Sequence, residues 1–594
     1  MNHSQFIQNN YKLIVGFIIS IALVLAVSSV WDDAPIVDEI PHIGAGYSYI
    51  AAGDHRLNPE HPPLAKDLAG IGVYLAGNNG SSFSTRYWRS DLNGQWEFGR
   101  HLLFSSGNDT LRMIRFSKSP QLIFFILSAI IIAVWTKRLY GNVASILALF
   151  LFSLSPTVLA HSRFVTTDIP ALFGVLLSSF FFLDFIKDQK PKKLVYAGLA
   201  FGVAQLTKFS LFLLNPVFLV IAITYALIHA SHGKKIQDSF KLLFKTILII
   251  GIGYLVVWIV YIPHVINYPP ELQKEHTTKL LETYGKRTLP DMVIYFSDKP
   301  VIRALAQYGL GFLMVVQRSI GGNTTYFLGE VSREAWKHYF PIVYFIKEPL
   351  AFWGLMAMVL SFFGIKINRS TFKAKTLIEW SKNHFTELAM FLWLAVYWYT
   401  SISANLNIGV RHLMPIYGFT YILLAGGLTH IGKNIKLKYF TGYLILCTSL
   451  LCWYMYENIK IYPYYLTYFN QTVGGAKNGY RYVVDSNIDW GQDLKRLSDW
   501  VEVNNVKNIY LDYFGWSDQS FYLKNNFIWL QSSRFRSKED FLTENPNGGW
   551  VAISATFYMG LSKQEGLDYN WLKLEDRFTT IGNSIFVWYV SPQN

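Results

Sequence analysis

Two adjacent acidic residues, Asp38 and Glu39, follow the first hydrophobic segment and open a stretch rich in carboxylates, histidines and prolines. A carboxylate at the mouth of a transmembrane bundle stays ionised in wet surroundings, while the bilayer beside it holds an apolar substrate. Such a group can accept the proton of an attacking hydroxyl. The pair therefore predicts acid–base chemistry at a membrane surface, although a merely solvated loop would also explain Asp38.

Further polar residues interrupt the apolar pattern, and they gather on the same side of the expected membrane. Asp168 precedes an apolar run and is either a site residue or a helix N-cap. Lys208 breaks a hydrophobic stretch, where it would meet an anionic group such as a phosphate or extend its long side chain to the interface. Charged residues near helix ends tend to face a bundle interior or an aqueous cavity. The remaining candidates are Arg163, Arg411, His412, His42, Glu60, His61 and Lys66.

Glu60 and His61 have metal-ligand chemistry, but two adjacent residues are a weak metal signal. A divalent metal near Glu60 stays open. No cofactor is required, because cationic side chains can neutralise a single phosphate. Arg411 and His412 have an alternative role as anchors of a helix end.

The elements that must position these residues are membrane helices. The 594 residues are 52% hydrophobic and only 15% charged, and the apolar residues form long runs. This composition excludes an ordinary soluble enzyme and predicts a polytopic α-helical membrane protein. A helix crosses about 30 Å of hydrocarbon with roughly 20 residues. We expect about eleven transmembrane helices, at 13–31, 121–135, 143–160, 169–186, 194–207, 211–228, 242–262, 341–365, 388–401, 413–431 and 439–456.

Lysine and arginine gather in alternate short loops, which are cytoplasmic by the positive-inside rule. This rule places the N-terminus in the cytoplasm and the outer loops 32–117 and 263–340 on the other side. Within the first outer loop, two short helices at 40–52 and 64–76 would hold the acidic residues at headgroup level. The net charge of +14 belongs largely to this topology signal, so we expect no nucleic-acid partner.

The sequence pattern changes near residue 470. Short strand patterns follow, together with one amphipathic helix at 493–505. We therefore expect a transmembrane module at 1–469 and a small soluble, extracytoplasmic α/β domain at 470–594. The expected strands are 480–487, 508–514, 549–557 and 584–590.

The membrane part resembles the polyprenyl-phosphate-dependent glycosyltransferases of the GT-C type. It is most similar to the bacterial relatives of protein O-mannosyltransferases (glycosyltransferase family 39) and of the lipid A aminoarabinose transferase. The resemblance implies an integral protein of a bacterial inner membrane, a polyprenyl-phosphate sugar donor, and a protein, lipid or glycan acceptor outside the cytoplasm. The motifs that carry it are DEIPHIGAGYSYI, RLNPEHPPLAK, SRFVTTDIPA, LTKFS, YFLGEVS, KEPL and NIGVRHLMP.

The same resemblance assigns roles. Asp38 matches the catalytic acidic position, with Glu39 beside it, and Asp168 matches a second outer-loop acid. Lys208 resembles the phosphate-binding lysine of the aminoarabinose transferase. That enzyme has a Glu-Lys pair before two prolines, where this chain has His61 in place of the lysine. The loop 263–340 is too short for the β-trefoil domain of eukaryotic protein mannosyltransferases, so their acceptor is not carried over.

The sequence thus predicts sugar transfer with inversion at the anomeric carbon. Asp38, assisted by Glu39, would be the base, and Asp168 would position the acceptor or the acidic loop. The donor phosphate would be bound by Lys208, Arg411 and His61, with support from His42, Glu60, Arg163 and His412.

Two other functions are compatible with parts of the sequence. A transporter or lipid flippase explains the membrane spans and charges, but it explains the motif-rich first loop less well, because transport sites are expected near the bilayer midplane. A functional soluble tail on a membrane anchor would need far fewer spans than eleven.

Overall fold

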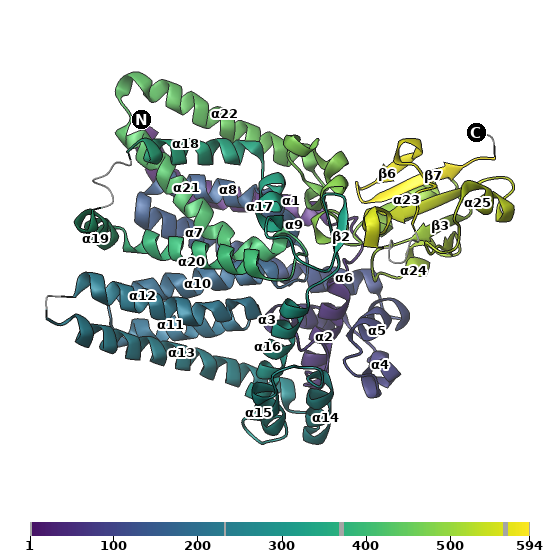
Figure 1. The fold of residues 1–594 in the computed structure, drawn as a ribbon, viewed down its shortest axis with the longest axis horizontal. Coiled ribbons are helices and arrows are strands. Elements are labelled where there is room, and N and C mark those ends of the chain that lie inside the picture. Colours follow the sequence, from purple (N-terminus) through teal and green to yellow (C-terminus); the bar gives the residue numbers. More distant parts are fainter. Residues whose placement is uncertain (1–2, 231–232, 367–372, 562–567, 593–594) are drawn as a thin grey trace.

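The computed structural model describes residues 3–230, 233–366, 373–561 and 568–592. Long helices run side by side, and a mixed sheet lies at one end of this bundle (Figure 1). The bundle consists of α1 (His3–Ser29), α7 (Leu122–Tyr140), α8 (Asn142–Ser153), α9 (Pro156–Ser162), α10 (Asp168–Lys187), α11 (Pro191–Gln205), α12 (Leu214–His229), α13 (Lys235–Val265), α17 (Tyr339–Lys347), α18 (Leu350–Lys366), α20 (Phe385–Ser403), α21 (Met414–Asn434) and α22 (Leu437–Ile461).

Every expected membrane segment coincides with a helix or a bent helix pair, but the count of eleven spans is not confirmed. Five described helices are long and apolar enough to cross a membrane, or up to seven if two bent pairs each form one span. The pairs are α8 with α9, bent by 63°, and α17 with α18, bent by 110°. Some of the other helices are short: α11 has only 15 residues.

The two expected helices of the first outer loop are confirmed as α2 (Glu39–Ala52) and α3 (Leu64–Ala76). Their backbones touch at Gly46 and Gly70, where a side chain on either helix would collide with the backbone of the other. Every residue of α2 from Glu39 to Tyr49 is buried. Protein therefore surrounds α2, and its depth at headgroup level stays a prediction. The loop continues with α4 (Arg86–Arg89), α5 (Gln95–Arg100) and α6 (Thr110–Lys118).

The second outer loop contains a helical hairpin and a small antiparallel ribbon. Its elements are α14 (Pro270–Leu280), α15 (Thr288–Phe296), α16 (Arg303–Gly321), β1 (Thr325–Phe327) and β2 (Glu330–Ser332). At the far end of the bundle from the mixed sheet, α19 (Ala374–Asn383) precedes α20 (Figure 1).

The C-terminal segment forms a five-stranded sheet of order β4-β3-β5-β7-β6. The central strand β5 pairs in parallel with β3 and antiparallel with β7, and helix α23 (Leu494–Val503) precedes β3. The helix expected at 493–505 and the strands expected at 508–514, 549–557 and 584–590 are confirmed. The other elements are β3 (Ile509–Asp512), α24 (Gln519–Leu523), β4 (Phe527–Trp529), α25 (Lys538–Glu544), β5 (Gly549–Ser554), β6 (Thr579–Ile581) and β7 (Ile585–Val590).

The strand expected at 480–487 is wrong. This stretch forms 3₁₀ turns, and its one ladder contact among the described residues is an isolated bridge between Val483 and Phe327. Asp485 adopts a φ of 55°, which a regular strand does not allow. This turn places Asp485 at the edge of the helix bundle.

One apolar core runs from the helices into the C-terminal segment. The same cluster of buried residues contains Phe124 of α7, Tyr480, and Val551 of β5. The apolar core is therefore continuous across the division expected at residue 470. A separate soluble domain at 470–594 stays a prediction.

Candidate active site

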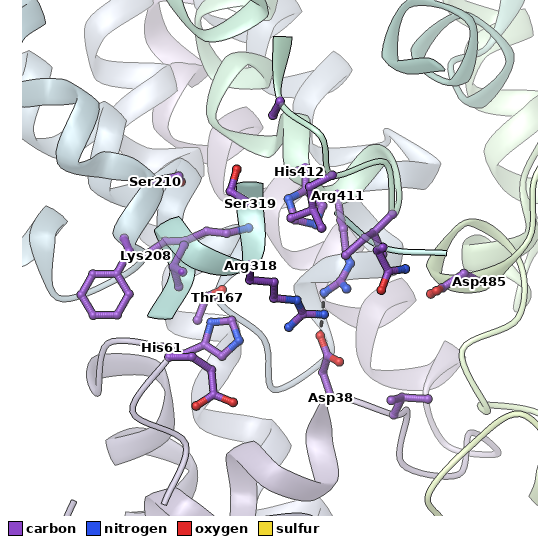
Figure 2. Close-up of a pocket in the computed structure, with 18 of the residues that line it drawn as sticks. Asp38, His61, Thr167, Lys208, Ser210, Arg318, Ser319, Arg411, His412 and Asp485 are labelled. Carbon is purple, nitrogen blue, oxygen red and sulfur yellow. Dashed lines mark hydrogen bonds and ion pairs between the residues drawn. The ribbon is translucent and has the colours of Figure 1, made fainter. Parts of the chain in front are cut away.

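A cavity of about 460 Å³ lies where the first outer loop, the helix bundle and the C-terminal segment meet (Figure 2). Three parts of the chain that are distant in sequence supply its walls. Of the residues predicted from the sequence, those that line it are Asp38, His42, Glu60, His61, Lys208, Arg411 and His412.

Asp38 immediately precedes α2, so the start of a buried helix fixes its backbone. Its Oδ2 accepts a hydrogen bond from Arg411 Nη1 at 2.6 Å. Burial alone would raise the pKa of Asp38, but the Arg411 guanidinium, with His42 and Arg318, lowers this pKa below its usual range. Asp38 is therefore a carboxylate at neutral pH, which is the form that can take up a proton.

Arg411 connects the three parts of the site. It lies in the 3₁₀ turn Val410–Leu413, which leads into α21. Its guanidinium contacts the Trp490 ring at 4.2 Å from the centroid, and its Nε donates to Ser486 Oγ at 3.2 Å. Stacking on an aromatic face holds a guanidinium flat and leaves its edge free for anions.

Lys208 and Asp168 form a second ion pair, with 2.7 Å between Nζ and Oδ1. Lys208 has extended backbone between α11 and the 3₁₀ turn Phe209–Leu213, so the interruption of the apolar run is a real break in the helix. Asp168 is the first residue of α10 and makes no capping bond as an N-cap, since Thr167 occupies that position. It lies behind the cavity wall, 3.8 Å from Arg411 Nη1, and orients the two cations.

Glu39 does not line the cavity, which corrects the expectation that it assists Asp38 directly. It is fully buried; its carboxylate pairs with Lys118 Nζ at 2.9 Å and accepts from the backbone amides of Ile36 and Val165. Adjacent helical residues point about 100° apart, which explains the different surroundings of Asp38 and Glu39. Glu39 thus holds the loop that carries Asp38.

Arg163 is also buried behind the site. It pairs with Asp33 at 2.9 Å and donates to the Ser29 carbonyl oxygen at 2.6 Å. Asp33 forms a second ion pair with Arg496 of α23 at 2.6 Å. The supporting role predicted for Arg163 is consistent with this position, because the pair fixes the chain just before Asp38.

Glu60 and His61 lie in the proline-rich turn of the first loop and line the cavity. Lys66 does not line the cavity but binds the same turn. The Lys66 ammonium donates to three carbonyl or amide oxygens of Asn58 and His61, and to Tyr49 Oη at 2.8 Å. Burial and the neighbouring His42 lower the pKa of His61 well below its usual value. His61 is therefore neutral at pH 7 and lacks the charge expected of a phosphate-binding residue.

Glu60 is bound by amide donors. It accepts hydrogen bonds from Gln95 at 2.6 Å and from Asn93 at 3.4 Å. Within the described ranges, no group of three or more His, Cys, Asp or Glu residues is arranged to hold a metal ion. The residues around Glu60 therefore do not fit a resident metal.

Two charged residues of the cavity were missed by the sequence reasoning, Arg318 of α16 and Asp485. Arg318 points toward Asp38 and Arg411 (Figure 2). Its side chain forms no ion pair or hydrogen bond with any residue that the structure describes. Arg318 thus faces the cavity as a cation that contacts no carboxylate directly, although it is close enough to help lower the pKa of Asp38.

The C-terminal segment holds the chain that leads to Asp38. The amide of Ala34 donates to the Gln492 carbonyl oxygen at 2.8 Å, and the amide of Val37 donates to that of Trp490 at 2.9 Å. With the Asp33–Arg496 ion pair, these bonds form a clasp around residues 33–37. The clasp positions the catalytic candidate from a segment about 450 residues away.

Comparisons with known proteins agree with this architecture. Residues 103–259 match a family model described as dolichyl-phosphate-mannose-protein mannosyltransferase, and this range contains Asp168 and Lys208. The S. cerevisiae protein O-mannosyltransferase Pmt1-Pmt2 complex, solved with its sugar donor, has a TM-score of 0.53 at 11% identity over 76% of this chain and 90% of that chain. The resemblance to GT-C glycosyltransferases is confirmed. The family model covers 157 of the 594 residues (103–259), and the likeness at 11% identity is one of fold.

Two further structures of GT-C proteins match more loosely. The apo oligosaccharyltransferase of Archaeoglobus fulgidus has a TM-score of 0.47 at 13% identity and covers 100% of this chain and 75% of that one. ArnT from Cupriavidus metallidurans, bound to undecaprenyl phosphate, has a TM-score of 0.31 at 13% identity and covers 98% of each chain. A comparison with curated protein sequences gives no match.

Proposed function

We propose that this chain transfers a sugar from a polyprenyl-phosphate donor to an acceptor hydroxyl outside the cytoplasm. One observation carries the proposal: a single cavity places the Asp38 carboxylate beside the cations Arg411, Arg318 and Lys208. A base for a hydroxyl and cations for a leaving phosphate are the two requirements of this reaction.

In the proposed reaction Asp38 accepts the proton of the acceptor hydroxyl as its oxygen attacks the anomeric carbon. The bond between that carbon and the phosphate oxygen breaks, and the lipid phosphate leaves with the electron pair. Direct displacement inverts the anomeric configuration. The Arg411 pair keeps Asp38 ionised before substrates bind, and a donor phosphate would then share the guanidinium.

The lining of the cavity is mixed. Leu213, Val315 of α16 and Phe340 of α17 supply apolar side chains that the lipid could contact, whereas Asp485 and Trp516 come from the C-terminal segment. The lysine-rich and arginine-rich loops that are expected to be cytoplasmic contribute no residue to this cavity. We therefore place this end of the bundle outside the cytoplasm.

The proposed function is tested by supplying membranes that contain the protein with candidate polyprenyl-phosphate sugars and measuring product mass. Formation of a glycosylated product with release of the lipid phosphate is expected, and the mass identifies both sugar and acceptor. Movement of the lipid across the membrane without bond cleavage would instead establish a flippase.

Lys208→Ala is expected to weaken donor binding about tenfold, because the phosphate loses one charge-assisted hydrogen bond. Lys208→Arg should retain part of the affinity. Titration of the purified protein with a polyprenyl-phosphate sugar measures the effect. Lys193→Ala removes a lysine that lies outside the cavity and should leave the affinity unchanged; equal affinity of Lys208→Ala and wild type would remove Lys208 from the donor site.

Donor binding is expected to weaken as the pH rises through about 6. Burial raises the pKa of Asp485 to about 6, against the lowering effect of Arg411. Asp485 is therefore neutral below this pH and adds a negative charge to the cavity above it, where that charge repels the phosphodiester. The charge of the phosphodiester is constant over this range. Affinity measured from pH 5 to 7.5 should show the step in wild type and lack it in Asp485→Asn; a step retained in the variant would assign it to another group.

A further inference from the structure

A second, larger cavity of about 1730 Å³ lies at the other end of the helix bundle. Helices α7, α10, α12, α17, α18, α20 and α21 line it together with α19, which lies far from the C-terminal sheet (Figure 1). None of its lining residues is shared with the candidate active site. The cavity is therefore distinct from the candidate active site.

One end of this cavity is positively charged. Arg138, Lys187 and Lys382 line it, and none of the three has a carboxylate partner in the described part of the chain. The Lys187 ammonium donates to the Thr386 hydroxyl at 2.7 Å. Among the described lining residues Glu387 is the one acid, and it accepts from Tyr140 Oη at 3.1 Å. Cations outnumber acids here, so this end favours an anion.

The rest of the cavity is apolar and is about one leaflet deep. From Glu387 at the charged end to Trp398, both on α20 and both lining the cavity, the helix rises about 16 Å. Half of a hydrocarbon core of about 30 Å is about 15 Å. Large apolar side chains on this wall remain exposed, with Leu360 at 64% and Phe391 at 50% of their surface. Apolar side chains exposed on membrane helices contact lipid chains.

We propose that this cavity binds an anionic two-chain phospholipid from the leaflet opposite the active site. The phosphate would lie among Arg138, Lys187 and Lys382, and the acyl chains would cover the wall from Trp353 to Trp398. The depth favours a phospholipid over a polyprenyl phosphate, because a polyprenyl chain is far longer than one leaflet. Basic pockets between transmembrane helices are known to recognise anionic headgroups.

The test is native mass spectrometry of the full-length protein after delipidation and incubation with defined lipids. We expect dioleoylphosphatidylglycerol to be retained in preference to dioleoylphosphatidylcholine. Arg138→Ala with Lys187→Ala should reduce its retention about tenfold or more, since each cation near a headgroup contributes to binding. Lys436→Ala with Lys438→Ala, a pair of lysines at the start of α22 outside the cavity, should have no effect.

A second variant tests the apolar wall without changing any charge. Ala395 lines the cavity on α20, so Ala395→Trp would fill it and should lower retention of both phospholipids. Thermal unfolding like that of wild type shows that these variants are folded. Equal retention of the two phospholipids by wild type, unchanged binding in the Arg138 and Lys187 variant, or displacement of phosphatidylglycerol by equimolar undecaprenyl phosphate would each overturn the proposal. None of these outcomes depends on glycosyl transfer.

Discussion

Asp38→Asn should lower the rate of sugar transfer by about a hundredfold or more while leaving donor binding intact. The amide has almost the same shape and still accepts the hydrogen bond from Arg411, but it cannot take up the proton of the acceptor hydroxyl. Single-turnover product formation at saturating donor isolates the chemical step from binding.

Asp32→Asn is the matched control for this variant. Asp32 lies in the same loop, is paired with Lys495 and does not line the cavity, so its variant should turn over like wild type. A folded Asp38→Asn protein with wild-type turnover would exclude Asp38 as the base and direct attention to Glu60 and Asp485, the other acids that line the cavity.

Arg411→Ala should weaken donor binding by about a hundredfold. The variant loses the hydrogen bonds to the donor phosphate. It also removes the positive charge beside Asp38, which lines the cavity, and beside Asp168, which lies behind the cavity wall. Both changes act against an anionic ligand. Arg411→Lys retains the charge but not the flat contact with Trp490, so an intermediate affinity is expected.

Arg481→Ala provides the comparison, because Arg481 is an exposed arginine of the C-terminal segment that does not line the cavity. Its donor affinity should equal that of wild type. If Arg411→Ala bound the donor within about twofold of wild type, while its thermal stability were unchanged, the phosphate would have to lie elsewhere in the cavity.

The sequence was most informative where a charged residue interrupts an apolar pattern. Lys208 stands out in its hydrophobic stretch, and the structure places it at a helix break in the cavity wall. Asp38 and Arg411 are distinctive for the same reason, although no local pattern indicates that residues 373 positions apart form an ion pair. Such a pair is created by tertiary packing alone.

The residues that were misplaced or missed have ordinary local patterns. Arg318 is one cation on an amphipathic helix, where a solvated side chain is the usual outcome. Asp485 lies in a stretch whose alternation indicates a strand, and its left-handed conformation is imposed by the surrounding turns. Glu39 is an acid in the same motif as Asp38, so the sequence does not distinguish their roles. The two side chains point in different directions, and only that of Asp38 lines the cavity.

The clasp around residues 33–37 also sets the order of events during synthesis. This segment leaves the ribosome about 450 residues before Trp490 and Gln492, the residues whose carbonyl oxygens hold it. Membrane helices can insert as they are made, but Asp38 has no fixed position until the last fifth of the chain has been translated and packed. Under the proposed function, a chain without Trp490 and Gln492 would lack the hydrogen bonds that position the base, so we expect it to be inactive.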